Sequence, residues 1–132
     1  MNKIKAVINE LSNIEGITKI IGEFDGKTIK AVTLEPPCNV RSGIASFFVF
    51  KETEVGLAKN LSGEISFSNR FEGELASLEK GKVLARVSID IGMQTITSII
   101  TTEAAERLEI CVGDKITAFV KATEVSLEAL DE

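Results

Sequence analysis

The sequence contains an internal repeat, and this feature constrains the fold more than any other. Residues 41–58 align with residues 111–128, and six of the eighteen aligned positions are identical, where average composition gives roughly one. The identical pairs are Gly43/Gly113, Lys51/Lys121, Thr53/Thr123, Glu54/Glu124, Val55/Val125 and Leu57/Leu127. Upstream, Asn2 aligns with Asn69 at an offset of 67 residues, which grows to 70 in the second block. We therefore expect two tandem domains, residues 1–60 and residues 61–132.

Within each copy, hydrophobic residues recur at every second position, which indicates half-buried β-strands. The clearest run is Val83, Ala85, Val87, Ile89 and Ile91, followed by a turn at Gly92 and a second extended run over 95–100. This pattern predicts a β-hairpin. We expect a mainly all-β fold with two tandem OB-like five-stranded β-barrels and at most one short helix each.

The one helix predicted with a clear start signal lies over 103–108 in the second copy. Thr101 and Thr102 precede it, and threonine is a favoured residue at a helix N-terminus. The first copy has Pro36 and Pro37 in the corresponding stretch, and these residues forbid a continuing helix. The two copies should therefore differ most between their third and fourth strands.

Composition and charge exclude several classes of function. The chain has no histidine and two cysteines, so the usual nucleophilic relays and zinc sites cannot be built, and no enzyme activity is expected. We expect Cys38 and Cys111 to be small reduced residues. The net charge of −5 lacks the basic footprint that nucleic acid requires, and no apolar run is long enough to span a membrane. The sequence therefore predicts a cytoplasmic protein that binds neither nucleic acid nor membrane.

Polar residues at the ends of the predicted strands form the candidate site. Lys51 and Lys121 are each followed two residues later by threonine, at Thr53 and Thr123, and residues 66–69 open the second copy with Ser-Phe-Ser-Asn. Ammonium, hydroxyl and backbone N–H groups together make a concave set of donors that suits an oxyanion. The alternative for each lysine is a solvated strand residue, although its recurrence in both copies favours a shared role.

The second copy resembles the molbindin family of molybdate-binding (Mop or TOBE-type) domains. The similarity lies in ISFSNRFEGEL at the start and in ITSIITTEAAERLEICVGDKITAFVKATEVSL further on, so that it covers nearly all of residues 65–127. The first copy resembles a more diverged member. The resemblance implies OB-like domains that bind molybdate or tungstate at interfaces between domains and subunits, in a cytoplasmic storage protein. It also implies a homotrimer in which three chains supply six domains.

The family pattern assigns oxyanion-binding roles to particular positions of this chain. The matching residues are Ser66, Asn69, Lys121, Ala122 and Thr123 in the second copy, and Asn2, Lys51 and Thr53 in the first. Ser68 stands where the family usually has arginine, so one permanent positive charge is absent from the expected site. Glu52 stands where the family has alanine, and its carboxylate would repel a dianion. The departure at Ser68 predicts a lower affinity in the second copy, and the departure at Glu52 predicts that sites built from first-copy residues are the first to be lost.

Two other functions remain open from the sequence. A ligand-sensing regulatory module would need a partner, either a transcription regulator or a molybdate transporter ATPase, because the chain has no helix-turn-helix pattern. A single-strand binder would use Phe47, Phe48 and Phe50 as stacking platforms, which the net charge of −5 opposes. The three phenylalanines could instead form core on one strand face and an oligomer interface on the other, or core alone.

Overall fold

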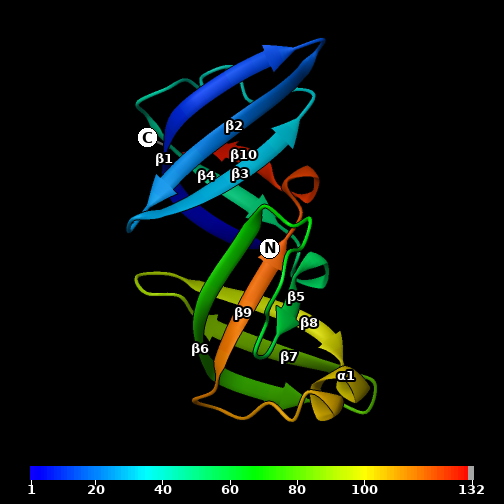
Figure 1. The fold of residues 1–132 in the computed structure, drawn as a ribbon. Helices are drawn as coiled ribbons and strands as arrows, with labels where there is room; N and C mark the ends of the chain where they lie inside the picture. The colour runs from blue at the N-terminus through cyan, green and yellow to red at the C-terminus, as the bar shows by residue number, and fades with distance from the viewer. Residues whose placement is uncertain (131–132) are drawn as a thin grey trace. The chain divides into compact units, whose positions relative to one another are not determined.

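The computed structural model describes residues 1–130 and contains two compact units, each built on one five-stranded antiparallel sheet (Figure 1). Unit 1 comprises Met1–Phe50 together with the chain from Lys121 onward, and unit 2 comprises Lys51–Val120. These units differ from the predicted domains 1–60 and 61–132, because the last segment of each sequence copy belongs to the unit of the other copy. The fold class itself, two small β-barrels in tandem, is confirmed.

The strands of each unit follow the same spatial order. In unit 1 the order is β10 (Ser126–Ala129), β4 (Ala45–Phe50), β1 (Asn2–Ile14), β2 (Ile17–Phe24) and β3 (Lys27–Thr33). In unit 2 it is β5 (Gly56–Ala58), β9 (Lys115–Val120), β6 (Asn69–Lys80), β7 (Leu84–Asp90) and β8 (Thr95–Thr101). In addition, β10 contacts β3 and β5 contacts β8, so each sheet curls into a barrel.

The first strand in each of these orders is the exchanged one. β5 follows β4 along the chain but pairs with β9, where Leu57 lies opposite Ala118. β10 follows β9 but pairs with β4, where Leu127 lies opposite Phe48. The two copies of the repeat are thus interlocked by reciprocal exchange of their last strands, and neither barrel is completed by its own copy alone.

The strand registers confirm the alignment of the two copies. Asn2 lies opposite Phe50 in unit 1, and Asn69 lies opposite Val120 in unit 2. These pairs reproduce the offsets of 67 and 70 residues found in the sequence. Both first strands also carry a register shift at the same place, between Ile8 and Glu10 and between Leu75 and Ser77. The two copies therefore correspond residue by residue in how their strands pair.

Burial follows the predicted alternation along β7 from Ala85 onward, whereas Val83, the first residue of the predicted run, is exposed and precedes the strand, and in β4 three consecutive residues are buried. Ala85, Val87 and Ile89 are fully buried on one face of β7, and the predicted hairpin of β7 with β8 is present. Phe48 and Phe50 are core residues, and Phe47 is half-buried with the Lys3 ammonium 5.8 Å from its ring centroid. Two of the three phenylalanines therefore cannot serve as exposed stacking platforms for a nucleic acid.

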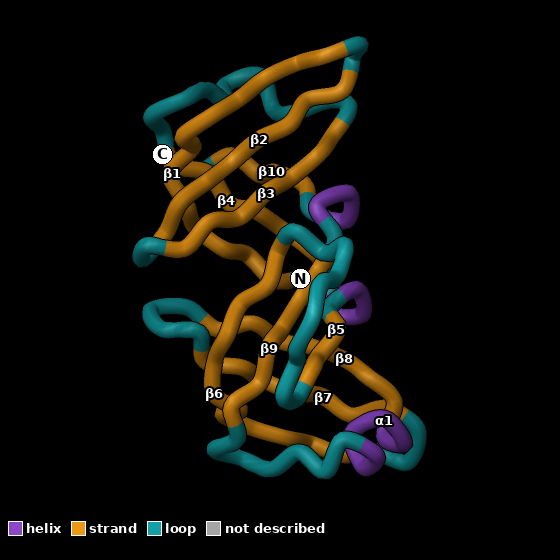
Figure 2. The backbone as a smooth tube through the Cα atoms, viewed as in Figure 1, coloured by secondary structure: helices purple, strands orange, loops and turns teal. Residues whose placement is uncertain are grey.

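The predicted helix is also present. α1 (Thr102–Arg107) begins after Thr101, whose hydroxyl accepts a hydrogen bond from the Ala104 N–H at 3.1 Å. The Thr102 hydroxyl donates to the Gly81 carbonyl at 2.8 Å and so fixes the helix to the β6–β7 hairpin. In unit 1 the stretch with Pro36 and Pro37 is a loop, drawn in teal in Figure 2. Proline decides this difference between the copies, as expected.

Two further observations concern the chain as a whole. Across residues 1–130, no helix has the length and apolar character needed to cross a membrane. Cys38 and Cys111 are both exposed free thiols, as the sequence predicts for reduced residues.

Candidate oxyanion-binding site

The nine residues singled out from the sequence divide between the two units. Unit 2 contains Lys51, Thr53, Ser66, Ser68 and Asn69, whereas unit 1 contains Asn2, Lys121, Ala122 and Thr123. Strand exchange causes this division, because the boundary between the units falls directly before each lysine. As a result, unit 2 combines the lysine turn of the first copy with the serine segment of the second copy.

Each lysine leads into a single turn of 3₁₀ helix, and the two turns have the same backbone. These turns are η1 (Glu52–Glu54) and η2 (Ala122–Glu124). Lys51 has φ −75° and ψ 145°, and Lys121 has φ −70° and ψ 142°. The Glu54 N–H donates to the Lys51 carbonyl at 3.0 Å, and the equivalent bond in η2 is 2.9 Å long. The shared Lys-x-Thr-Glu-Val sequence therefore encodes one conformation twice.

The valine that ends each turn anchors it to a barrel. Val55 and Val125 are buried, with 3% and 1% of their surface exposed, while the lysine and threonine of each turn are exposed. Burying a valine side chain contributes about 1.5–3 kcal/mol, which is enough to hold so short a turn against the core. The lysine and threonine side chains of both turns consequently lie at the surface.

In unit 2, the register of the sheet brings the predicted segments to one end. Gly56, which follows η1, lies opposite Phe119 near the end of β9. On the other side of β9, Asn69 begins β6 opposite Val120, so the Ser66–Ser68 segment enters at the same end. Lys121 follows Val120 directly in the chain. The segments that carry the exposed residues Ser66, Ser68, Thr53 and Lys51 thus lie at the same end of the sheet.

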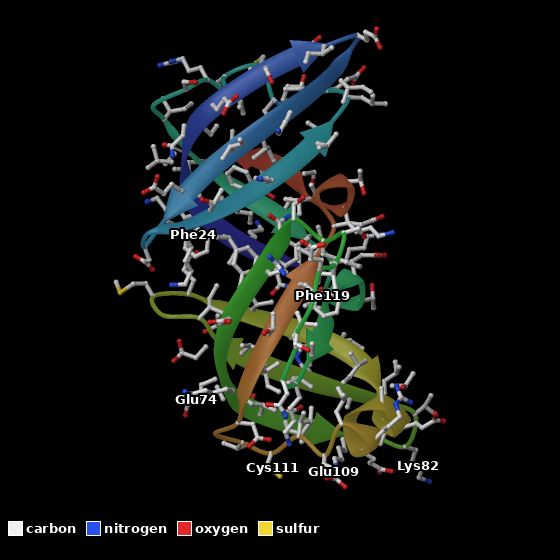
Figure 3. The ribbon with its side chains drawn as sticks, viewed as in Figure 1. Phe24, Glu74, Lys82, Glu109, Cys111 and Phe119 are labelled. Atoms are coloured by element: carbon white, nitrogen blue, oxygen red, sulfur yellow. The ribbon has the colours of Figure 1, made fainter. Side chains whose placement is uncertain are left out.

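An aromatic pair fixes this arrangement, and the sequence alone did not indicate it. Phe119, labelled in Figure 3, packs edge-on against Phe67 with ring centroids 4.8 Å apart. A Cβ atom built at Gly56 would overlap the Phe119 ring, so a larger residue there would force the ring to move. Phe67 is flanked by the two serines, and Gly56 lies three residues after Thr53. The Phe119 ring therefore tethers both donor segments to β9.

The two asparagines differ from the other predicted residues in burial. Asn69 is fully buried and Asn2 is 5% exposed, whereas the serines, threonines and lysines of the site are exposed. A buried asparagine amide requires hydrogen-bond partners inside the protein. Asn69 is thus placed to hold the start of β6, directly after the serine segment, and its side chain is not on the surface.

The donor sets of the two turns differ in charge. Glu52 lies in the first position of η1, where η2 has Ala122, and both side chains are half-buried. Hence η1 carries two carboxylates, Glu52 and Glu54, beside its lysine, whereas η2 carries only Glu124. Glu52 in place of Ala122 is thus the one sequence difference between the two Lys-x-Thr-Glu-Val turns.

Among residues 1–130, no group of three or more histidine, cysteine, aspartate or glutamate side chains could hold a metal ion. The cavity of about 600 Å³ in unit 2 lies elsewhere on the sheet, with Glu72, Glu74 and Asp90 in its lining against the single cation of Lys115. That lining disfavours an anion. The exposed ammonium and hydroxyl groups at the strand ends are suited to binding an anion through hydrogen bonds.

Comparison with known proteins finds a matching domain family and similar relatives for much of the chain. Residues 65–127 match the TOBE domain family. The chain is 41% identical over 66 residues to molybdenum-pterin-binding protein 2 of Clostridium pasteurianum, covering 49% of this chain and 97% of that protein. It is 34% identical over 73 residues to the molybdenum transport protein ModE of Herbaspirillum seropedicae, covering 54% of this chain but only 27% of that protein.

A solved structure is similar over nearly the whole chain. The cytoplasmic molybdate-binding protein ModG, in a form with molybdate bound, matches with a TM-score of 0.92 at 27% sequence identity. The match covers 98% of this chain and 96% of that chain. Both copies of the repeat therefore have counterparts in one known two-barrel protein.

Proposed function

Since the chain belongs to the molybdenum-pterin-binding family of TOBE-domain proteins, the molbindins, we propose that it binds molybdate or tungstate as the intact oxyanion. The similarity to a cytoplasmic molybdate-binding protein supports this ligand and a role in cytoplasmic storage. The observation that supports the proposal is that the segments carrying exposed Lys51, Thr53, Ser66 and Ser68 lie at one end of the unit 2 sheet.

The physical basis of binding is replacement of water by fixed donors. A dianion that leaves water loses strong hydration, and charge-assisted hydrogen bonds from ammonium, hydroxyl and backbone N–H groups must replace it. Each Lys-x-Thr turn supplies one ammonium and one hydroxyl to an ion. Ser66 and Ser68 supply further hydroxyls, and Ala122 a backbone N–H. Asn69 keeps the serine segment in place from inside the barrel.

Selectivity follows from the protonation state and size of the ion. Phosphate carries a proton near neutral pH and needs an acceptor, whereas molybdate and tungstate offer only acceptors to a site made of donors. Sulfate is also fully deprotonated, so the size of the site must separate it from the larger metal oxyanions. The expected order is therefore molybdate and tungstate well above sulfate, with phosphate weakest.

We also propose that the protein acts as a homotrimer and without catalysis. Donors from more than one chain around one ion would couple assembly to ligand, because a ligand that binds only the assembled form stabilises it by mass action. Analytical ultracentrifugation with and without molybdate tests this point. A monomer under both conditions would contradict it.

Titration calorimetry of the purified protein with molybdate, tungstate, sulfate and phosphate tests the proposed ligand. Binding of the two metal oxyanions, with at least a hundredfold preference over sulfate, is the expected result. Absence of heat with both metal oxyanions, from protein shown by elemental analysis to be free of molybdenum and tungsten, would overturn the proposal.

A regulatory role is the second candidate, favoured by the similarity to a molybdenum transport protein of which this chain covers 27%. In this role the chain would sense the ion and bind a transcription regulator or a transporter ATPase. Affinity capture from cells with and without molybdate separates the roles, because storage predicts ion-loaded protein alone and sensing predicts a ligand-dependent partner.

A further inference from the structure

Ser98 makes a buried contact with the turn that carries Lys51 and Thr53. It lies on the interior face of β8 and is fully buried. Its hydroxyl donates to the Val55 carbonyl at 2.7 Å, across 43 residues of sequence. Val55 is the residue that ends η1, two positions after Thr53. The hydroxyl of Ser98 therefore joins the barrel interior directly to the candidate binding turn.

The equivalent position in unit 1 has no hydroxyl. Val87 lies opposite Ser98 in unit 2, and Ile20 lies opposite Ala31 in unit 1. Val87 and Ile20 are 67 residues apart, the offset that relates Asn2 to Asn69. Ala31 is also fully buried, so the two positions share their environment and differ in one oxygen atom. The turn with Lys121 and Thr123 cannot receive this bond from Ala31.

A bond at this place affects the turn more than the barrel. The 3₁₀ turn spans three residues, and its own backbone bonds do not define where it lies relative to the sheet. Valine burial is shared by both turns, whereas the Ser98 bond fixes the carbonyl of Val55 in unit 2 alone. Donors that are already held in place lose less conformational freedom when the ligand binds, so their site binds more tightly.

We propose that Ser98 is a positioning residue for the oxyanion site that contains Lys51 and Thr53, and this inference rests on the proposed function. Ser98 does not touch the ion. It holds the turn with Lys51 and Thr53 in its binding geometry. The turn with Lys121 and Thr123 has Ala31 at the equivalent position and lacks this support.

The test compares Ser98→Ala with a matched control, Ser46→Ala. Ser46 is a second buried serine, and its hydroxyl donates to the Glu128 carbonyl of an exchanged strand at 3.0 Å, in unit 1 and away from either turn. Both variants lose one buried hydroxyl bond to a backbone carbonyl. A merely structural role of Ser98 would give them similar losses of melting temperature and no difference in affinity.

Titration calorimetry with molybdate is carried out in two backgrounds that isolate each site. In Lys121→Ala protein, where the Lys51 site remains, Ser98→Ala is expected to weaken binding about fivefold and Ser46→Ala less than twofold. In Lys51→Ala protein, Ser98→Ala is expected to leave affinity unchanged. Amide exchange of Glu54 and Val55 should accelerate in Ser98→Ala alone.

Equal affinities of the Ser98→Ala and Ser46→Ala proteins, or equal loss in both lysine backgrounds, would overturn the inference while leaving the proposed function intact. A wild-type protein that binds neither molybdate nor tungstate would overturn the proposed function and this inference with it. If Ser98→Ala does not fold, Ser98→Cys keeps the side-chain size with a weaker donor. It is expected to weaken the Lys51 site about twofold, and unchanged binding would contradict the inference.

Discussion

The two units contain the same Lys-x-Thr-Glu-Val turn, yet each holds its exchanged segment at a different point. Unit 2 holds its segment at the turn itself, through the Ser98 hydroxyl and the Val55 carbonyl. Unit 1 holds its segment further along β10, where Glu128 accepts from Ser46 through its carbonyl and from the Lys3 ammonium at 2.9 Å through its side chain. After duplication, the copies kept the turn and changed what supports it.

A second contrast lies in how closely each exchanged strand packs. Gly56 in unit 2 touches the Phe119 ring, whereas the corresponding residue of unit 1 is Ser126, whose side chain is exposed. The arrangement in unit 2 couples strand exchange to the position of the serine segment through Phe67. We therefore expect a larger side chain to be tolerated poorly at Gly56 in unit 2 and well at Ser126 in unit 1.

The largest expected effect follows from this packing. Gly56→Val should destabilise the protein by about 2–3 kcal/mol, because the new side chain overlaps the Phe119 ring. Ser126→Val, at the matching exposed position, should change stability by less than about 0.5 kcal/mol. Guanidinium unfolding monitored by circular dichroism measures both. Similar losses in the two variants would show that the units pack their exchanged strands alike.

The next prediction concerns the two lysines. Lys121→Ala should weaken molybdate binding by about 2 kcal/mol, roughly thirtyfold, since a hydrogen bond to a charged ligand is lost. Lys51→Ala should have a smaller effect, because Glu52 already weakens its site. Calorimetry gives both values, with exposed Lys19→Ala as a control that binds normally. The reverse ranking would mean that the Glu52 carboxylate does not act on the ion.

A smaller effect is expected at the helix that only unit 2 contains. Thr101→Ala removes the hydroxyl that caps α1 and should cost about 1 kcal/mol. Leu34, 67 residues earlier in unit 1, is 71% exposed, and Leu34→Ala should be nearly neutral. Thermal unfolding of the two variants checks the comparison. A neutral Thr101→Ala would show that the Thr102 contact alone holds the helix.

The smallest expected effect is a loss of stability at acidic pH. We expect it in unit 2 alone, at Asp114. The Cys111 backbone N–H, which donates to Asp114 at 2.8 Å, lowers the pKa of Asp114 below its ordinary value of 3.8, and Lys59 lowers it further. A lowered folded-state pKa means that the carboxylate stabilises its loop above about pH 4 and that this contribution disappears as pH falls through the lower value. Unit 1 has Ile44 at this position.

NMR titration of the Asp114 carboxyl carbon measures this shift directly. The midpoint should lie below 3.8 in the wild-type protein and move upward, though not fully, in Lys59→Ala. A midpoint at or above the ordinary value would contradict the role of the Cys111 N–H.

Much of the fold could be predicted because its signals are local. The alternation of hydrophobic residues predicted the β7–β8 hairpin, and Thr101 predicted the start of α1. Pro36 and Pro37 explained why unit 1 has no such helix. The repeat alignment gave the offsets of 67 and 70 residues, which the strand pairs of the two units reproduce. Each of these features depends on residues close in sequence or on a direct comparison of the two copies.

Strand exchange could not be predicted, because β5 is only the three residues Gly56–Ala58, too short a stretch to carry a signal for the barrel that it joins. For the same reason, the pairing of Lys51 with the serine segment in one unit was not foreseen. Phe119, Gly56 and Ser98 were missed because their roles arise only after exchange brings distant segments together. A comparison of Ser98 with Ala31 in the aligned copies was the one available signal.

The most direct test of the account is a crystal structure of the protein soaked with tungstate, in which anomalous scattering locates each tungsten atom. The account predicts tungsten with an oxygen within hydrogen-bond distance of the Thr53 or Thr123 hydroxyl and of the lysine in the same turn. Tungsten bound elsewhere, with both turns unoccupied at saturating tungstate, would contradict it.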